Sequence, residues 1–294
     1  MKIAAAKYPI DAPATFDDFA ASQARWIAEA AALGARVAVL PEYLSLALGA
    51  TFAPDIAGDL RASLAAIQTH RAAWIDLFSG LARTHGLHVV AGTFLLEVGS
   101  GRYRNRADLF KADGGHAWQD KLQLTGFEKM TGVIDGGDAL KVFELDGVRA
   151  GIAICYDIEF PLPVRAQCEA GARLLLVPSC TDTAAGATRV RVGCLARALE
   201  NRAFVAKAVT AGEAAWSPAL DVNTGEATLY APMDVGLPAD GVLATTDAPS
   251  GWACADCDPL ALADSRAQAQ VANDRDWAGQ LAPGLRQARV EAAD

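Results

Sequence analysis

The sequence has little of what marks several large classes of protein. It holds four histidines and six cysteines in 294 residues. Six cysteines in a chain of this length do not form a disulfide-dense scaffold, so we expect reduced thiols. No apolar run reaches the roughly 18 residues that a membrane-spanning helix needs, which argues against a membrane protein.

Positive charge is also scarce. Against 35 Asp and Glu stand 26 Lys and Arg, which gives a net charge of -9 and an isoelectric point near 5.0. With no cluster of five or more basic residues, this balance argues against nucleic acid or an anionic membrane surface as partner. Residues 1–11 carry two lysines and an aspartate and lack the core of a signal peptide, so we expect a soluble, cytoplasmic protein.

The composition that remains is that of a globular α/β protein. Hydrophobic residues make up 52% and charged residues 21%, enough for a sizeable core without disulfides. The pattern is strand-helix-strand-helix-strand, then antiparallel hairpins, then strand-helix-strand-helix-strand again. No repeat, linker or charge run marks a boundary, so we predict one domain over residues 1–294 with mixed sheets. From about residue 250 onward the pattern is hard to read.

Local signals place several elements. A helix is expected over residues 14–34, because Thr15 followed by Asp18 fits a capping box and Gly34 stops the helical stripe. Residues 58–85 are expected to be helical up to Gly86, and residues 125–138 to form a glycine-rich loop. Two hairpins are expected, one over residues 139–157 around Asp146-Gly147 and one over residues 216–233 around Thr224-Gly225.

Three polar residues stand where apolar strands end. Glu42 follows "RVAVLP", Lys121 follows "HAWQD" and Cys155 follows "VRAGIAI". Active sites of α/β proteins gather at the carboxyl ends of strands, so we expect the three side chains to converge on one pocket. Taken singly, each has a plainer interpretation: a buried packing cysteine, a solvated loop acid and a surface cation.

The segments that carry these residues resemble the signature segments of the nitrilase superfamily, the carbon–nitrogen hydrolases. The matching stretches are "VLPEY", "KLQLTGFEK" and "GIAICYDIEFP", supported by "GARLLLVPS" and "RALENRAFVAKAV". They occur in the order of the family and cover roughly residues 1–250. The chain is also similar to the branch related to acetyltransferase-fused members. It departs from many relatives at Leu162, where they have a glutamate after Phe-Pro.

The resemblance implies a four-layer α-β-β-α sandwich that pairs into a homodimer or a higher homo-oligomer. It implies hydrolysis of a non-peptide C–N bond through a Cys thioester. The substrate it favours is a small linear carboxamide, which would give a carboxylic acid and ammonia. Cys155 would be the nucleophile, Glu42 the general base and Lys121 the stabiliser of the oxyanion. No metal or organic cofactor is needed, since thiol, base and cation all come from the chain.

Further site residues follow from the same resemblance and from strand ends. Glu128, in "TGFEK", would orient the substrate or the lysine, and the backbone N–H of Tyr156 would be the second oxyanion donor. Tyr43, Cys180 and Thr181 follow strands and are expected to line the substrate pocket.

Other functions remain open at this point. A nitrilase or an N-carbamoyl hydrolase would use the same triad, and a non-catalytic binding member would retain the pocket. Cys254 and Cys257 form a single C-x-x-C that could serve thiol redox chemistry, although zinc would need two more ligands. A Cys-His mechanism is disfavoured, because no histidine is clearly placed at the carboxyl end of a strand; the four are His70, His85, His88 and His116.

Overall fold

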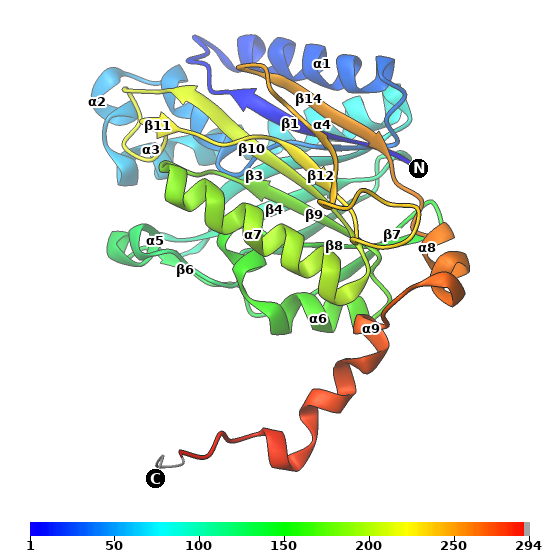
Figure 1. Cartoon of the computed structure of the whole chain (residues 1–294). Coiled ribbons are helices and arrows are strands. Elements are labelled where there is room, and N and C mark those ends of the chain that lie inside the picture. Colours follow the sequence, from blue (N-terminus) through cyan, green and yellow to red (C-terminus); the bar gives the residue numbers. More distant parts are fainter. Residues whose placement is uncertain (291–294) are drawn as a thin grey trace.

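The computed structural model describes residues 1–290 and shows a curled sheet with helices on its outside (Figure 1). The sheet runs in the order β5-β4-β3-β2-β1-β10-β9-β8-β7. These strands are β1 (Lys2–Pro9), β2 (Val37–Val39), β3 (His88–Gly99), β4 (Arg102–Phe110), β5 (His116–Asp120), β7 (Val142–Leu145), β8 (Val148–Ile152), β9 (Leu174–Ser179) and β10 (Phe204–Glu213). Five further strands pair with members of this order or with one another: β6 (Ile134–Asp135), β11 (Val222–Asn223), β12 (Thr228–Tyr230), β13 (Val242–Thr245) and β14 (Gly251–Asp256).

Helices cover both halves of this sheet. The α-helices are α1 (Phe16–Ala32), α2 (Pro54–Ala57), α3 (Leu60–Ile67), α4 (Arg71–His85), α5 (Gly126–Thr131), α6 (Pro161–Glu169), α7 (Ala184–Asn201), α8 (Ala261–Asp264) and α9 (Asn273–Asp276). The 3-10 helices are η1 (Leu44–Thr51), η2 (Gln68–His70), η3 (Cys155–Glu159), η4 (Ser265–Gln268), η5 (Trp277–Leu281) and η6 (Pro283–Leu285).

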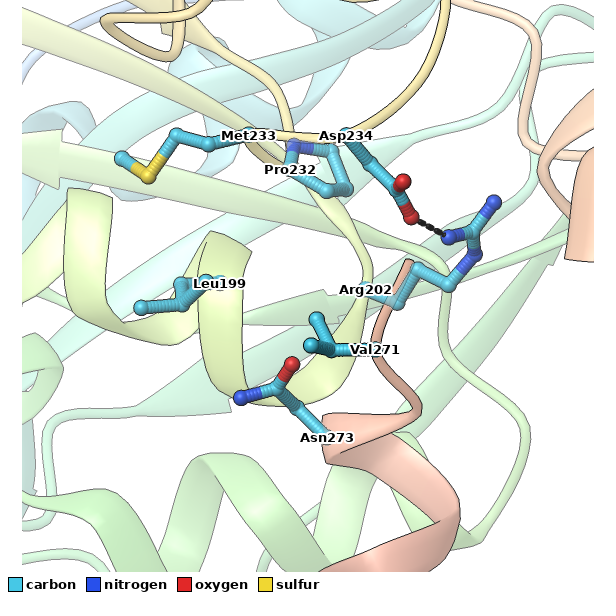
Figure 2. A pocket seen from close by; sticks show the side chains of 7 residues that line it. All are labelled: Leu199, Arg202, Pro232, Met233, Asp234, Val271 and Asn273. Atoms are coloured by element: carbon cyan, nitrogen blue, oxygen red, sulfur yellow. Dashed lines mark hydrogen bonds and ion pairs between the residues drawn. The ribbon is translucent and has the colours of Figure 1, made fainter. Parts of the chain in front are cut away.

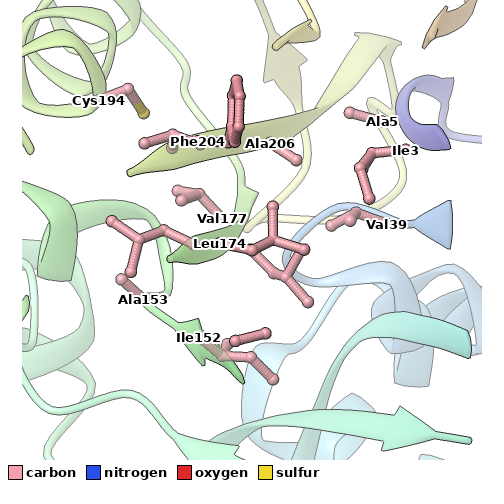
Figure 3. Packing of buried hydrophobic residues seen from close by; sticks show 14 of the residues in the cluster. Ile3, Ala5, Val39, Ile152, Ala153, Leu174, Val177, Cys194, Phe204 and Ala206 are labelled. Carbon is pink, nitrogen blue, oxygen red and sulfur yellow. The ribbon is translucent and has the colours of Figure 1, made fainter. Parts of the chain in front are cut away.

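Strand β1 is where the two halves of the sheet meet. It pairs in parallel with β2 on one side and with β10 on the other. Because successive side chains of a strand point to opposite faces, Ile3 enters the core between the halves, whereas Ala4 faces α1 and α4. Figure 3 shows part of the inner core, in which Ile3 and Val39 from one half belong to the same cluster as Ile152 from the other.

The helix signals in the sequence are largely confirmed. The α1 capping box is present: the Asp18 N–H donates to Thr15 Oγ1 at 3.1 Å, and the Thr15 N–H donates to Asp18 Oδ2 at 3.0 Å. The stretch over residues 58–85 is helical but divides into α3, η2 and α4, and ends at Gly86 in the left-handed region.

Two local predictions are wrong. Residues 125–138 contain α5 and β6 rather than a loop, because a second capping box begins a helix that the glycines obscured. Residues 216–233 do not form a hairpin, since β11 and β12 each pair with β10 instead of with each other. The segment after residue 250 contributes β14, which pairs antiparallel with β1. The last four residues of the predicted domain, 291–294, lie outside the described part.

Among residues 1–290, no helix combines the length and the apolar character required to cross a bilayer.

Candidate active site

A cavity of about 300 Å³ lies where the loops after β2, β5 and β8 meet. Glu42, Lys121 and Cys155, from these three loops, all line it, as the sequence predicts. Its remaining lining residues come from the turn before η1, from α5 and its N-cap, from α7, from β11 and from the segments that follow β9 and β10: Tyr43, Thr125, Phe127, Cys180, Asp182, Arg189, Pro218, Ala219, Asp221 and Val222.

Close backbone packing holds Glu42 in place. Gly92 on β3 has φ +63°, and a Cβ there would lie 2.1 Å from the carbonyl oxygen of Pro41, so the turn requires glycine. Tyr43 adopts a left-handed φ of 62°, and its N–H donates to Thr93 Oγ1 at 2.8 Å. The turn after β2 is therefore tied to β3, and Glu42 is only 1% exposed.

Lys121 joins two buried carboxylates. Its backbone N–H donates to the carbonyl of Asn105 on β4 at 2.8 Å, which fixes its place after β5. Its Nζ lies 2.7 Å from Glu42 Oε1 and 2.8 Å from Glu128 Oε2. Burial alone would lower the pKa of Lys121, but the two carboxylates more than reverse this and raise it. Lys121 therefore remains an ammonium ion at neutral pH.

Cys155 stands at a sharp turn that a buried carboxylate organises. It has a left-handed φ of 47°. Asp157 accepts backbone N–H bonds from Ile154 at 3.1 Å, Leu122 at 3.1 Å and Gln123 at 2.7 Å. Burial raises the pKa of Asp157 to about 6, against the effect of these hydrogen bonds. Asp157 thereby connects the turn of the thiol to the loop that follows the lysine.

The thiol and the carboxylate meet at the main chain of Cys180. The Cys155 Sγ–H donates to the Cys180 carbonyl at 3.4 Å, and the Cys180 N–H donates to Glu42 Oε2 at 3.0 Å. Burial, and then the charge of Glu42, raise the pKa of Cys155 well above its ordinary value. Burial also raises the pKa of Glu42, with Lys121 opposing and Glu128 reinforcing the shift. The sulfur therefore rests as a thiol beside a carboxylate that holds a proton more readily than usual.

Glu128 is held more tightly than Glu42. Its Oε2 accepts from the Thr125 N–H at 2.9 Å within the α5 capping box, and its Oε1 accepts from the Tyr43 hydroxyl at 2.8 Å. Burial opposes ionisation, but the charge of Lys121 and these donors lower the pKa of Glu128 overall. Glu128 is thus a fixed anion, whereas Glu42 is suited to proton exchange.

Asn105 is a site residue that sequence reasoning missed. Its side-chain Nδ2 donates to Glu42 Oε1 at 2.8 Å and to Glu128 Oε1 at 3.1 Å. The signal was present in "RYRNRADLF": Asn105 alternates with Ala107 and Leu109, which belong to the core between the halves of the sheet, and a fully buried amide in this position needs partners.

Two predicted pocket residues do not line this cavity. The Tyr156 ring packs edge-on against Phe160 at a centroid separation of 4.9 Å. The backbone N–H of Tyr156 lies in the first turn of η3, where N–H groups have no acceptor within the helix, so it is free of intrahelical bonds. The Thr181 hydroxyl donates instead to the carbonyl of Thr224 at 2.6 Å.

The alternative chemistries find less support in the geometry. The residues that line the cavity include no histidine. Cys254 and Cys257, like the other cysteines, are free thiols and lie outside the lining. Within residues 1–290, no cluster of three or more His, Cys, Asp or Glu side chains could hold a metal ion.

A second hollow lies beside the C-terminal segment (Figure 2). Arg202 and Asp234 form an ion pair across it, as Figure 2 shows. Its volume is about 10 Å³, room for about one water molecule, so it is a packing gap rather than a binding site. Five other side chains complete its lining: Leu199, Pro232, Met233, Val271 and Asn273.

The larger cavity therefore combines a protonated thiol, a carboxylate that can accept its proton and a fixed ammonium. A thiol beside a base is the arrangement that attacks electrophilic carbon, and a buried cation stabilises the charge that develops on oxygen.

The chain is similar in sequence to known proteins. Residues 2–234 match the family model described as carbon-nitrogen hydrolase. The probable hydrolase YhcX of Bacillus subtilis (strain 168) is 29% identical over 247 residues, which cover 84% of this chain but 47% of YhcX. The omega-amidase NIT2 of Xenopus tropicalis is 27% identical over 257 residues, which cover 85% of this chain and 86% of NIT2.

Solved structures share the fold. A mutant amidase from Nesterenkonia sp. AN1, with acrylamide added to its active-site cysteine, superimposes with a TM-score of 0.65 at 25% identity, covering 94% of this chain and 99% of that chain. Saccharomyces cerevisiae Nit3, a nitrilase-superfamily member, gives a TM-score of 0.70 at 19% identity, covering 94% and 96%. These likenesses confirm the predicted α-β-β-α sandwich.

Proposed function

The chain belongs to the carbon–nitrogen hydrolase family and is an amidase-type hydrolase, and on that premise we propose that it hydrolyses a small linear carboxamide to a carboxylic acid and ammonia. We propose Cys155 as the nucleophile, Glu42 as the general base and Lys121 as the oxyanion stabiliser. The single observation that carries the proposal is the Lys121 ammonium bonded to two buried carboxylates in the cavity that also holds the thiol.

In the first half-reaction the Cys155 sulfur attacks the amide carbon while Glu42 takes the thiol proton. The new C–S bond converts the carbonyl oxygen into an oxyanion, which Lys121 and the Tyr156 N–H stabilise. The C–N bond then breaks as Glu42 returns the proton to the leaving nitrogen. Ammonia departs and a thioester on Cys155 remains.

In the second half-reaction a water molecule attacks the thioester carbon while Glu42 takes one of its protons. The C–S bond breaks, Glu42 returns the proton to the sulfur, and the carboxylic acid leaves. Because Glu42 accepts and returns one proton in each half, a pKa raised by burial suits it to both steps. Glu128 keeps its charge and orients Lys121 throughout.

The cavity limits the substrate. A volume of about 300 Å³ suits a small molecule rather than a polypeptide. Phe127 and Val222 would contact an aliphatic chain, while Asp182, Asp221 and Arg189 give polar contacts at the lining. A nitrilase or N-carbamoyl hydrolase would use the same three residues, so the carboxamide is chosen on the amidase relatives.

Other proposals accompany this function. We propose that residues 1–294 form one domain, that two copies or more associate, and that the protein acts in the cytoplasm without nucleic acid or membrane as partner. A binding role without catalysis would leave the thiol and its base without a use. Redox chemistry at Cys254 and Cys257 would be independent of the cavity.

Mass spectrometry of Cys155 tests the proposed function. The protein is incubated with aliphatic amides, nitriles and N-carbamoyl compounds, and free ammonia is measured in parallel. We expect an acyl adduct on Cys155 and ammonia release with an amide. Both should vanish in Cys155→Ala because no other group supplies the thioester.

Cys168→Ala is the matched control, since Cys168 is as buried as Cys155 but lies on α6 outside the cavity. It should retain adduct and turnover, as should Cys254→Ser. Binding of all compounds without ammonia release, or undiminished turnover by Cys155→Ala, would refute the proposed function.

A further inference from the structure

Asn105 contacts both carboxylates of the Lys121 cluster and the main chain of Lys121. It lies on β4, fully buried, between the turn that carries Glu42 and the helix that carries Glu128. Its side chain reaches both carboxylates at 2.8 and 3.1 Å. Its backbone carbonyl accepts the Lys121 N–H at 2.8 Å. One residue therefore holds the main chain of Lys121 through its carbonyl and both anions through its side chain.

The chemistry of the amide determines how it must be oriented. An asparagine nitrogen carries two N–H donors, and two carboxylate oxygens lie within reach of it. The opposite orientation would place the amide oxygen, an acceptor, against two further acceptors. With both donors used on the carboxylates, Asn105 Oδ1 has no hydrogen-bond partner within residues 1–290. The amide NH2 therefore faces the two anions, and the amide oxygen is left without a hydrogen bond.

The charge count shows why such a donor is needed. When both carboxylates are ionised, Glu42, Glu128 and Lys121 carry a net charge of minus one in a region that is at most 1% exposed. Lys121 alone cannot neutralise both carboxylates, and buried charges need hydrogen bonds to remain ionised. Asn105 donates to both anions without adding a charge that would compete with Lys121 for the oxyanion.

We propose that Asn105 is the positioning residue of this site, which holds Glu42 ionised and aligned beside Cys155 while keeping it apart from Glu128. The proposal rests on the proposed function for its catalytic consequence. Asn105 is not a catalytic residue, since it lies behind the carboxylates and does not line the cavity.

The expected signature is a change in pH dependence. Hydrogen bonds donated to a carboxylate favour its ionised form, so removing them makes Glu42 harder to ionise. Since Glu42 must be ionised to act as base, the acidic limb of the rate profile moves to higher pH. Groups on every neighbouring element also face Glu42 and are unchanged by the substitution: Lys121 after β5, Glu128 on α5, Tyr43 before η1, Cys155 on η3 and Cys180 after β9.

The experiment follows Cys155 directly as well as turnover. Iodoacetamide alkylates a thiol by forming an S–C bond and releasing iodide, and the thiol proton passes to a base. The rate of Cys155 alkylation, read by peptide mass spectrometry across pH, therefore reports the base without requiring a substrate. Amide hydrolysis is measured on the same preparations.

Asn105→Ala should move the acidic limb of alkylation to higher pH and lower kcat roughly 10- to 100-fold, the loss expected for hydrogen bonds to a charged group. Asn105→Asp keeps the shape but sets a third carboxylate beside the other two, so its limb should move further. Asn201 provides the matched control: it is 1% exposed, donates through Nδ2 to the Arg197 carbonyl at 3.1 Å and also leaves Oδ1 unpaired. Asn201→Ala and Asn201→Asp should keep the wild-type limb.

A folded Asn105→Ala or Asn105→Asp protein with the wild-type limb would overturn the proposal. So would failure of both variants to fold while the Asn201 variants fold, because Asn105 would then be structural. Failure of the proposed function is distinguishable, since it would show as wild-type protein that alkylates at Cys155 but hydrolyses no amide.

Discussion

Two lysines of this protein are almost completely buried, and only one of them lines the cavity. Lys121 and Lys207 are each 1% exposed. Lys207 on β10 pairs with Glu226 at 3.1 Å, and the Glu226 side chain is 32% exposed. Lys121 pairs with Glu42 and Glu128, whose side chains are at most 1% exposed.

The difference lies in how each charge is balanced. Lys207 and Glu226 form a neutral pair whose carboxylate still reaches water, so neither group holds unused charge. Around Lys121 one buried negative charge is left over, and it is held by hydrogen bonds from Asn105, Tyr43 and Thr125. An excess anion beside a thiol is a proton acceptor, whereas a balanced pair is structural. Burial of a lysine alone therefore does not identify a site.

Replacing each lysine by methionine should give the largest contrast. Lys121→Met removes the oxyanion donor, so kcat for amide hydrolysis should fall by at least about 100- to 1,000-fold. It also leaves two buried carboxylates without their cation, so the free energy of unfolding should fall by about 3–5 kcal/mol. Lys207→Met should keep kcat within a few-fold. Ammonia release and urea unfolding measure the two effects, and equal losses of kcat in both variants would break the comparison.

Replacing a glutamate partner of each lysine by glutamine, Glu128 for Lys121 and Glu226 for Lys207, should change the pH dependence of kcat/KM only at Lys121. The charge of Glu128 contributes to the raised pKa of Glu42, so Glu128→Gln should lower that pKa. Ionised base then persists at lower pH, and the acidic limb of kcat/KM moves to lower pH, opposite to the shift expected for Asn105→Ala. We expect kcat to fall roughly 10- to 100-fold because Lys121 loses a charged acceptor.

Glu226→Gln is the control for that change. Glu226 lies outside the cavity lining and does not contact Glu42, so the limb should stay in place. The pH dependence of kcat/KM decides between them, and a limb that moves to higher pH in Glu128→Gln would contradict the electrostatic argument.

The sequence indicates the strands, because burial imposes an arrangement of apolar residues that is visible within a few positions. Polar residues at the ends of those strands then indicate that the ends converge. The segments before Glu42 and Cys155 correspond to the largely buried strands β2 and β8, the segment before Lys121 corresponds to β5, and the structure brings the three side chains into one cavity. The division of residues 58–85 into three helical pieces could not be predicted, since no proline or glycine marks η2.

What the sequence could not reveal is contact between distant segments. Asn105 meets a glutamate 63 positions earlier and another 23 positions later, and no local pattern encodes such a pair. The same limit applies at the end of β9, where the main chain of Cys180 reaches the site while the Thr181 hydroxyl donates to the Thr224 carbonyl.

The two capping boxes give the smallest and most local test of the Lys121 cluster. Thr15→Ala on α1 and Thr125→Ala on α5 each remove a cap, so the free energy of unfolding should fall by about 1 kcal/mol in both. Only Thr125 also donates to Glu128, through Oγ1 at 3.1 Å, so kcat should fall about 3- to 10-fold in Thr125→Ala and stay unchanged in Thr15→Ala.

Proton linkage separates the two caps further. The folded-state pKa of Glu128 is lowered, so its ionisation stabilises the fold above the unfolded-state pKa, and this contribution is lost as pH falls through the folded-state pKa. The part of the Thr125→Ala deficit that arises from Glu128 should therefore be present at pH 7 and shrink under acid. Asp18 makes the corresponding bonds to Thr15 at an exposed position. Urea unfolding of both variants at neutral and acidic pH measures the difference, and identical pH dependence would mean that Glu128 is held without help from Thr125.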